Sequence, residues 1–172
     1  MKEYFILFKP RDVVSGDFYW FDEIDNKQFI AVADCTGHGV PGAFMTMLGT
    51  QALTDIIVQK GIHKPNEILL ELDKTLYKLL KSDSSRLVDG MDIVICVIDK
   101  IAKTLTFAGA KNPIILIHDN ELHEIKGDKI SINGPRKSRE NIQYIVDTAK
   151  AGELLGMKLI YLEAGSGAIE PV

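Results

Sequence analysis

The sequence has little cysteine, no membrane-length apolar run and no excess of basic charge. Only two cysteines, Cys35 and Cys96, occur among its 172 residues. They lie too far apart for a metal-ligand motif, so we expect a protein of the reducing cytoplasm and not a disulfide scaffold. The apolar run near the N-terminus, residues 4 to 8, is too short for a signal sequence or a membrane span. The 20 basic and 24 acidic side chains offer no basic face, which argues against nucleic acid and membrane partners.

What the sequence does contain is typical of a globular domain. Hydrophobic residues make up 46% of the chain and charged residues 26%. These values are close to the average of folded proteins and exclude disordered and fibrous classes. A chain of this length buries enough surface for one proper core, so we expect one domain that carries at most an appendage.

Hydrophobic periodicity divides the chain into three parts. Period-two patterns predict strands at residues 3 to 9, 13 to 21 and 28 to 34, and the last two form a hairpin. Helical spacing predicts a helix from Val40 to Lys60 and an amphipathic helix that begins at Pro65 or Asn66. Short strands return at residues 93 to 98, 104 to 108, 114 to 117 and 122 to 125. This order predicts an α+β layered domain with antiparallel sheets.

The pattern changes beyond a seam near residues 134 to 138. A helix is predicted over residues 140 to 155 and a strand over 158 to 162, followed by a glycine-rich loop. Such an α/β unit is out of keeping with the meander before it. We therefore predict two parts, residues 1–134 and an appended helix-strand fragment over 135–172.

Two segments, VSGDF and ADCTGHG, concentrate the chemical signal. Each places an aspartate, Asp17 or Asp34, at a strand end beside glycine, and the hairpin brings the two together. Close carboxylates repel unless they are protonated or share a cation, and oxygen ligands favour Mg²⁺, Mn²⁺ or Ca²⁺. Gly37 and Gly39 allow the backbone to approach a bound ion or phosphate. The alternative is that each aspartate only caps a turn.

Four motifs in order, GDFYW, ADCTGHGVPGAFMTMLG, DGMDIVICVID and LTFAGAKNPIILI, carry a family resemblance. From about residue 3 to residue 133 the chain resembles the SpoIIE-type branch of the PPM (type 2C) serine/threonine phosphatases. The resemblance implies an antiparallel β-sandwich flanked by helices, with a site for two Mn²⁺ or Mg²⁺ ions at one end. It also implies hydrolysis of a phosphoserine by metal-activated water, on a phosphoprotein such as an anti-sigma-antagonist-like regulator.

The same resemblance assigns site residues by motif position. Asp17 matches the first metal aspartate, Asp34 matches the aspartate that bridges both ions, and the Cys35 backbone carbonyl completes one shell. No residue is assigned a catalytic role beyond the metal-bound water. We expect five further residues to lie next to the site: Gly16, Gly37, His38, Gly39 and Asp92. The simpler role of His38 is a local hydrogen bond, and that of Asp92 is to form a turn.

The family's later SDG-like and DD segments, which carry ligands of the second metal, have no match after Asn133. We therefore predict an incomplete sandwich with one metal half-site, and open sheet edges through which the chain could self-associate. Two functions stay open on this basis. The domain is either a metal-dependent phosphatase, impaired by the loss, or an inactive remnant that acts as a binding module.

The tail over about residues 138 to 172, which includes YLEAGSG, resembles a fragment of geranylgeranylglyceryl phosphate synthase, a TIM-barrel prenyltransferase. On that resemblance Tyr161, Glu163, Ser166 and Gly167 would be phosphate-binding positions. One strand-helix unit cannot make a barrel active site, so prenyl transfer is not expected. We interpret the chain as a join of two unrelated pieces, with glycerol-phosphate or prenyl-lipid binding by the tail as a weaker alternative.

Overall fold

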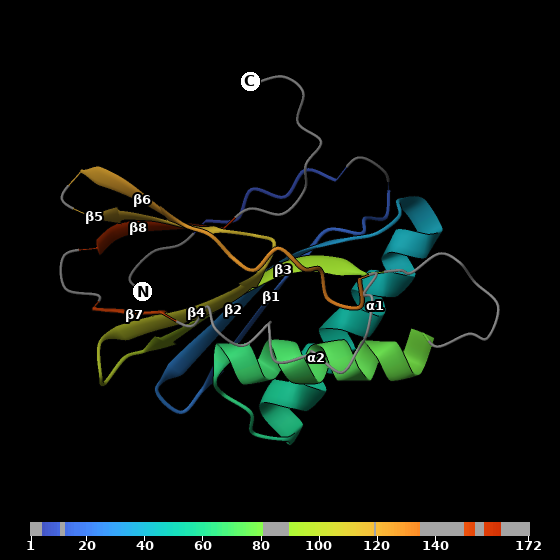
Figure 1. The fold of residues 1–172 in the computed structure, drawn as a ribbon, viewed down its shortest axis with the longest axis horizontal. Coiled ribbons are helices and arrows are strands. Elements are labelled where there is room, and N and C mark those ends of the chain that lie inside the picture. The colour runs from blue at the N-terminus through green and yellow to red at the C-terminus, as the bar shows by residue number, and fades with distance from the viewer. Residues whose placement is uncertain are drawn as a thin grey trace.

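A computed structural model describes residues 5–10, 13–80, 90–118, 120–134, 150–153 and 157–162 of the chain. The strands form two antiparallel sheets, one with the order β1-β2-β3-β4-β7 and one with the order β6-β5-β8 (Figure 1). The larger sheet consists of β1 (Phe18–Ile24), β2 (Lys27–Cys35), β3 (Met91–Asp99), β4 (Thr104–Ala110) and β7 (Lys150–Glu153). The smaller sheet consists of β5 (Ile114–His118), β6 (Glu121–Ile125) and β8 (Met157–Leu162). The predicted α+β sandwich is thus confirmed.

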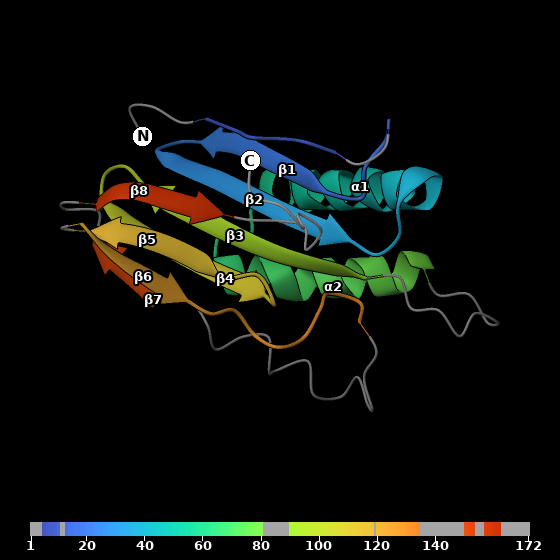
Figure 2. The same cartoon turned by 90° about the horizontal axis from the view of Figure 1, so that it is seen from above.

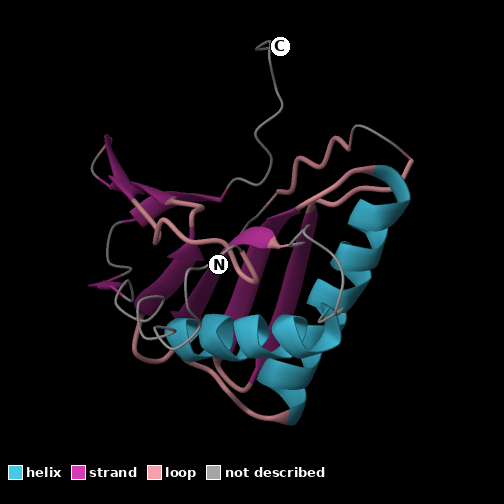
Figure 3. Ribbon diagram, turned by 45° about the vertical axis from the view of Figure 1, so that its right-hand side comes forward, coloured by secondary structure: helices cyan, strands magenta, loops and turns pink. Residues whose placement is uncertain are grey.

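Two helices cover the face of the larger sheet that the smaller sheet leaves open (Figures 1 and 2). Helix α1 (Gly39–Thr54) continues without a break into the π-helical turn η1 (Asp55–Gln59), and α2 (Pro65–Leu80) follows. Gly61 has a φ of +65° and lies just past η1, where a left-handed residue ends the helix. The two helices cross each other over the sheet (Figure 3). Both helices predicted for this part of the chain are confirmed.

The core has two layers because β3 is buried on both faces. Ile93, Ile95 and Val97 pack toward the helices, whose own contribution includes the fully buried Leu69 and Leu72. The alternate residues of β3 pack into the second layer, between the two sheets: Val94, Cys96 and Ile98, together with Leu105, Phe107, Ile114 and Leu116. Each such side chain stabilises the fold by about 1.5–3 kcal/mol relative to its exposed state. Cys96, which alternates with apolar neighbours along β3, is thus an interior residue.

Three predicted elements differ from the structure. Residues 5–10 form no strand, and Phe5 and Leu7 are exposed by 79% and 86%. A β-prone segment becomes a strand only where a sheet edge pairs with it, and β1 pairs with β2 alone. The strand predicted over residues 13–21 is shifted and begins at Phe18.

The helix predicted over residues 140–155 is wrong at residues 150–153, which form β7 against β4. The free edge of β4 offers ladder hydrogen bonds that a helical pattern in the sequence does not reveal. Residues 140–149 lie outside the described part of the chain. In the described segments no helix has the length and apolar character needed to cross a membrane.

Candidate metal centre

Strand pairing places three aspartates side by side at one end of the larger sheet. Asp34 is the direct cross-strand partner of Asp92 in the β2–β3 ladder. Phe18 pairs with Ala33, so Asp17, which precedes β1, lies next to Asp34 on the other side. We call Asp17, Asp34 and Asp92 the carboxylate row. Asp34 and Asp92 lie in the adjacent strands β2 and β3 and Asp17 directly precedes β1, so the antiparallel register brings them together.

The charges of the row act on one another. The pKa of Asp34 is raised from 3.8 to about 6, first by its partial burial and then by the Asp17 carboxyl group, which is close enough for a hydrogen bond between the two side chains. Asp92 adds to the rise, whereas the positive charge of Lys111 opposes it. Two carboxyl groups that share a proton have oxygen positions that a cation could take instead.

Glycines allow the loops that carry the row to touch. A β-carbon on Gly16 would lie 2.8 Å from the carbonyl oxygen of Gly37 and 3.0 Å from that of Cys35. A β-carbon on Gly42, in the first turns of α1, would lie 2.6 Å from the same Gly37 oxygen and 3.0 Å from the Gly16 Cα. The three segments therefore pack backbone against backbone, which holds the Cys35 carbonyl next to the residue before Asp17.

Hydrogen bonds fix the same loops. Thr46 in α1 donates its hydroxyl proton to the carbonyl oxygens of Ser15 (2.9 Å) and Gly16 (3.1 Å). The Ser15 hydroxyl oxygen in turn accepts the backbone N–H of Asp17 at 2.9 Å. On the far side of the row, the Thr36 N–H donates to the Gly90 carbonyl at 2.8 Å. The row is thus positioned by helix α1 as well as by the sheet.

The donor set of the row fits a hard cation. It offers carboxylate oxygens and a backbone carbonyl, the ligands that Mg²⁺ and Mn²⁺ prefer. Within the described residues, however, no group of three or more His, Cys, Asp or Glu side chains is arranged to hold a metal ion. Asp17, Asp34 and the Cys35 carbonyl are the groups that could hold one cation here, with Asp92 adjacent in the β2–β3 ladder.

The other predicted residues are distributed around this row. His38 is exposed and precedes α1 in an extended conformation (φ −122°). Gly37 and Gly39 both have positive φ angles, +92° and +62°, in the turn between β2 and α1. Of the tail positions, Tyr161 lies in β8 opposite Ile115, away from the row. Glu163, Ser166 and Gly167 lie outside the described residues.

Sequence reasoning missed two residues of the β4–β5 turn. Lys111 places its ammonium nitrogen 3.3 Å from the Asp92 carboxylate. Asn112 donates its side-chain amide to the Asp92 carbonyl oxygen at 3.1 Å. No sequence signal pointed to them, because their position depends on the pairing of β3 with β4. Asp92 was expected to serve mainly as a turn former, yet the register makes it a neighbour of Asp34.

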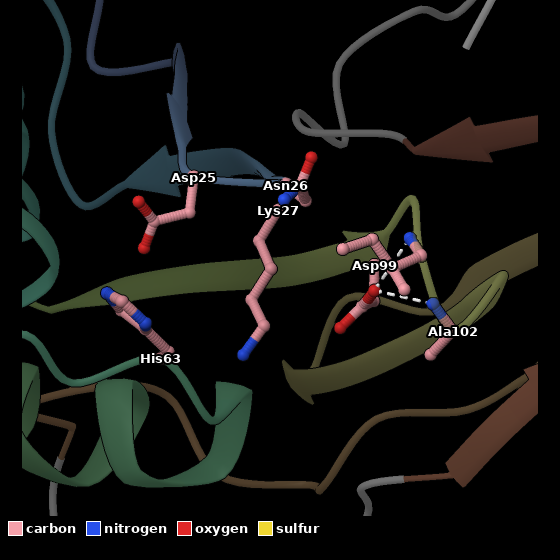
Figure 4. Close-up of a pocket in the computed structure, with 7 residues that line it drawn as sticks. Asp25, Asn26, Lys27, His63, Asp99 and Ala102 are labelled. Atoms are coloured by element: carbon pink, nitrogen blue, oxygen red, sulfur yellow. Dashed lines mark hydrogen bonds between the residues drawn. The ribbon is translucent and has the colours of Figure 1, made fainter.

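A shallow pocket of about 300 Å³ lies at the opposite end of the sheet (Figure 4). Asp25, Lys27 and His63 point into it from the β1–β2 turn and from the loop before α2. Asp99 also lines it, but its carboxylate accepts the Ala102 N–H and so stabilises its own turn. Mixed charges around an open depression do not converge on a ligand atom, so the carboxylate row is the better candidate.

Comparison with known proteins gives the family and the fold neighbours of the chain. The sequence model of the family described as Stage II sporulation protein E (SpoIIE) matches residues 24–131. The SiaA-PP2C domain of Pseudomonas aeruginosa is 41% identical, with a TM-score of 0.66 over 74% of this chain and 50% of that one. RsbX in complex with magnesium shares the fold at 16% identity, with a TM-score of 0.56 over 85% of this chain and 63% of that one.

A second likeness covers a short stretch. Thirty-five residues, or 20% of the chain, are 66% identical to geranylgeranylglyceryl phosphate synthase of Flavobacterium johnsoniae, of which they cover 14%. The chain thus spans half of the SiaA-PP2C chain and a small part of the synthase. The family match, in contrast, extends over more than half of the chain and includes β2, both helices and the strands β3 to β6. On this match, the chain belongs to the SpoIIE family.

Proposed function

We propose that this chain is a metal-dependent serine/threonine phosphatase domain that hydrolyses a phosphoserine on a protein substrate. The observation that carries the proposal is the carboxylate row, in which the β1–β2 register sets Asp17 beside Asp34 and the Asp17 carboxyl group helps to raise the pKa of Asp34. The row lies at a sheet end and is only half buried, so a phosphorylated side chain of another protein could reach it. Family membership and the likeness to a PP2C domain support the same activity.

Mn²⁺ or Mg²⁺ is the proposed cofactor, and the fold neighbour RsbX, whose structure is a complex with magnesium, supports it. Asp17, Asp34 and the Cys35 carbonyl would hold one such ion. When bound, such an ion would supply activation of water and charge stabilisation for the phosphoryl oxygens. The residues themselves position the site: Thr46 and Gly42 fix the loop that precedes Asp17, and Asp92 holds Lys111 at the rim.

The test is phosphate release from a phosphoserine peptide at millimolar Mn²⁺, with Asp34→Asn as the variant. We expect turnover by the wild-type chain and its loss in Asp34→Asn. Asp55→Asn is the matched control, because Asp55 is exposed on η1 and its contact with Gln51 survives the change. Turnover that persists in Asp34→Asn, or that does not need metal, would contradict the proposal.

A binding module without turnover is the second candidate. It is favoured by the small number of ligands, since the described residues hold no cluster of three metal-binding side chains. Calorimetric titration with Mn²⁺ beside the activity assay separates the two candidates, because metal binding accompanied by turnover favours the enzyme, whereas one weak ion without turnover favours the module.

The remaining proposals concern the whole chain. We propose a cytoplasmic location, supported by two free cysteines, and a regulator of the anti-sigma-antagonist kind as substrate, supported by family membership. Self-association is supported by exposed apolar side chains beside the edge strand β1, among them Phe5, Leu7 and Tyr19.

We further propose that residues 1–134 and 135–172 have separate origins, which the synthase-like stretch supports. Sequencing the source locus tests this origin, and two intact separate genes there would assign the join to an artefact. A weaker alternative is that the tail binds glycerol phosphate or a prenyl lipid. Binding of glycerol phosphate that persists in Asp17→Asn but is lost in Gly165→Val would support it.

A further inference from the structure

Lys111 has an unusual backbone conformation for a side-chain-bearing residue. Its φ is +63°, a left-handed value that glycine adopts more readily than lysine. Two backbone hydrogen bonds hold the turn in this state. The Lys111 N–H donates to the Asp128 carbonyl at 2.6 Å, and the Asp128 N–H donates to the Gly109 carbonyl at 2.7 Å. Strain of this kind persists where the surroundings fix it.

The side chain of Lys111 reaches the carboxylate row. Its ammonium nitrogen is 3.3 Å from Asp92, and its side chain keeps half of its surface exposed. An ammonium group has three N–H donors, and the contact with Asp92 is an ion pair. The group also acts on Asp34 through its charge. Lys111 therefore presents a positive charge to solvent at the rim of the row.

The chemistry of the proposed substrate suits this position. A phosphate monoester carries up to two negative charges, and lysine binds such a group as a compact point charge. A divalent cation held by Asp34 would repel the ammonium group and weaken its contact with Asp92. A substrate phosphate that approaches the same cation would attract the Lys111 ammonium group. We propose, on the basis of the proposed function, that Lys111 is a substrate-binding residue whose ammonium group binds the substrate phosphate.

Lys103 provides a matched control at the other end of the sheet. It is exposed, has the same charge and has a similar left-handed φ of +54°, but it lies in the β3–β4 turn far from the row. Lys111→Gln and Lys103→Gln therefore remove the same charge from the same backbone state. Lys111→Arg keeps the charge and serves as the rescue variant. Lys111→Gly and Lys103→Gly form a second matched pair that also relieves the backbone, for use if the glutamine variant does not fold.

The experiment combines kinetics with a binding measurement. Steady-state hydrolysis of an aryl phosphate at saturating Mn²⁺ gives KM and kcat, and calorimetry measures the binding of inorganic phosphate to the Mg²⁺-loaded protein. Loss of a charged, half-exposed hydrogen bond typically weakens binding about tenfold. We expect Lys111→Gln to raise KM and the phosphate Kd by about that factor, with kcat changed less than about twofold. Lys111→Arg should restore most of the affinity, and Lys103→Gln should behave as wild type.

The outcomes separate this proposal from the proposed function. If wild type turns over substrate but Lys111→Gln keeps its KM and phosphate Kd, Lys111 is only a counter-ion and the proposal on Lys111 is overturned. If wild type shows no turnover but binds phosphate in a Lys111-dependent manner, the binding role stands and the enzymatic function fails. If wild type neither turns over substrate nor binds phosphate, both are overturned.

Discussion

Replacing Asp34 by Asn should stabilise the metal-free protein at neutral pH. The pKa of Asp34 is raised in the folded state, from 3.8 to about 6, by burial and by the charges of Asp17 and Asp92. A carboxyl group with a raised pKa favours the folded state only while it is protonated. Its contribution is therefore present below pH 3.8 and is lost as the pH rises through about 6. Asparagine carries no charge and can donate the same hydrogen bond to Asp17, so it avoids this loss.

The structure sets the size of the effect. A pKa difference of this extent corresponds to at most about 3 kcal/mol at pH 7.5. Asp34 is only partly buried, so water screens its charge, and we halve that figure to about 1–2 kcal/mol. With an m-value of about 2 kcal/mol per molar urea, the middle of the range for small domains, the midpoint should rise by about 0.5–1 M.

Urea unfolding in EDTA, at pH 4 and at pH 7.5, measures this effect. We expect Asp34→Asn to exceed wild type at pH 7.5 and to lose most of that advantage at pH 4, while Asp55→Asn follows wild type at both. Millimolar Mn²⁺ should then stabilise wild type but not Asp34→Asn, because a ligand that binds only the folded state raises its stability. An Asp34→Asn variant that is no more stable than wild type at pH 7.5 in EDTA would refute the electrostatic reasoning.

Three further predictions concern residues that hold the site and the core. Gly42→Ala should lower the free energy of unfolding by about 2–3 kcal/mol and weaken Mn²⁺ binding, because its β-carbon would overlap backbone atoms of Gly37 and Gly16. Gly61 has a positive φ but open space around it, so the control Gly61→Ala should lower the free energy of unfolding, measured in urea, by only about 1 kcal/mol. Asp73→Ala should cost about 2 kcal/mol, because the buried Asp73 carboxylate accepts the Asn133 N–H at 2.7 Å, and Asp73→Asn should recover most of it. Burial raises the pKa of Cys35 to about 12 and also raises that of Cys96, so iodoacetamide at pH 8 should label both thiols slowly in the native state and fast in urea. Rapid native labelling of both would contradict the described core.

The elements that sequence reasoning located are those whose pattern is local. The amphipathic stripe of α2 and the alternation of β3 to β6 fix each element from its own residues. Segments whose state depends on a distant partner were mispredicted. Residues 5–10 have β-prone composition without a strand, and residues 150–153 form a strand because the β4 edge is free to pair with them. Whether each segment forms a strand depends on pairing with a distant part of the chain, which the residues of the segment do not reveal.

The candidate site divides in the same way. Asp17 and Asp34 were expected to converge because a short hairpin joins their strands, and the β1–β2 register brings them together. The position of Asp92 depends on a ladder between strands separated by both helices, so only its motif was visible in the sequence. Lys111 was missed altogether. Its approach to the row needs the β3–β4 register and a left-handed turn, and an isolated lysine after a strand predicts neither.

At one end of the larger sheet charged side chains form ion pairs and turn hydrogen bonds, whereas at the other end like charges lie side by side. This difference supports the proposed site. At the β1–β2 and β3–β4 turns, Glu23 pairs with Lys100, and Asp99 accepts backbone N–H groups of its own turn, so the charges there serve stability. At the opposite end, Asp17 and Asp34 repel one another, and Lys111, the cation that lies against the row at Asp92, is half exposed. The doubly buried β3 and the helix layer supply the stability that tolerates this repulsion. A fold that pairs Glu23 with Lys100 at one end and sets Asp17 against Asp34 at the other departs from local consistency at the proposed site.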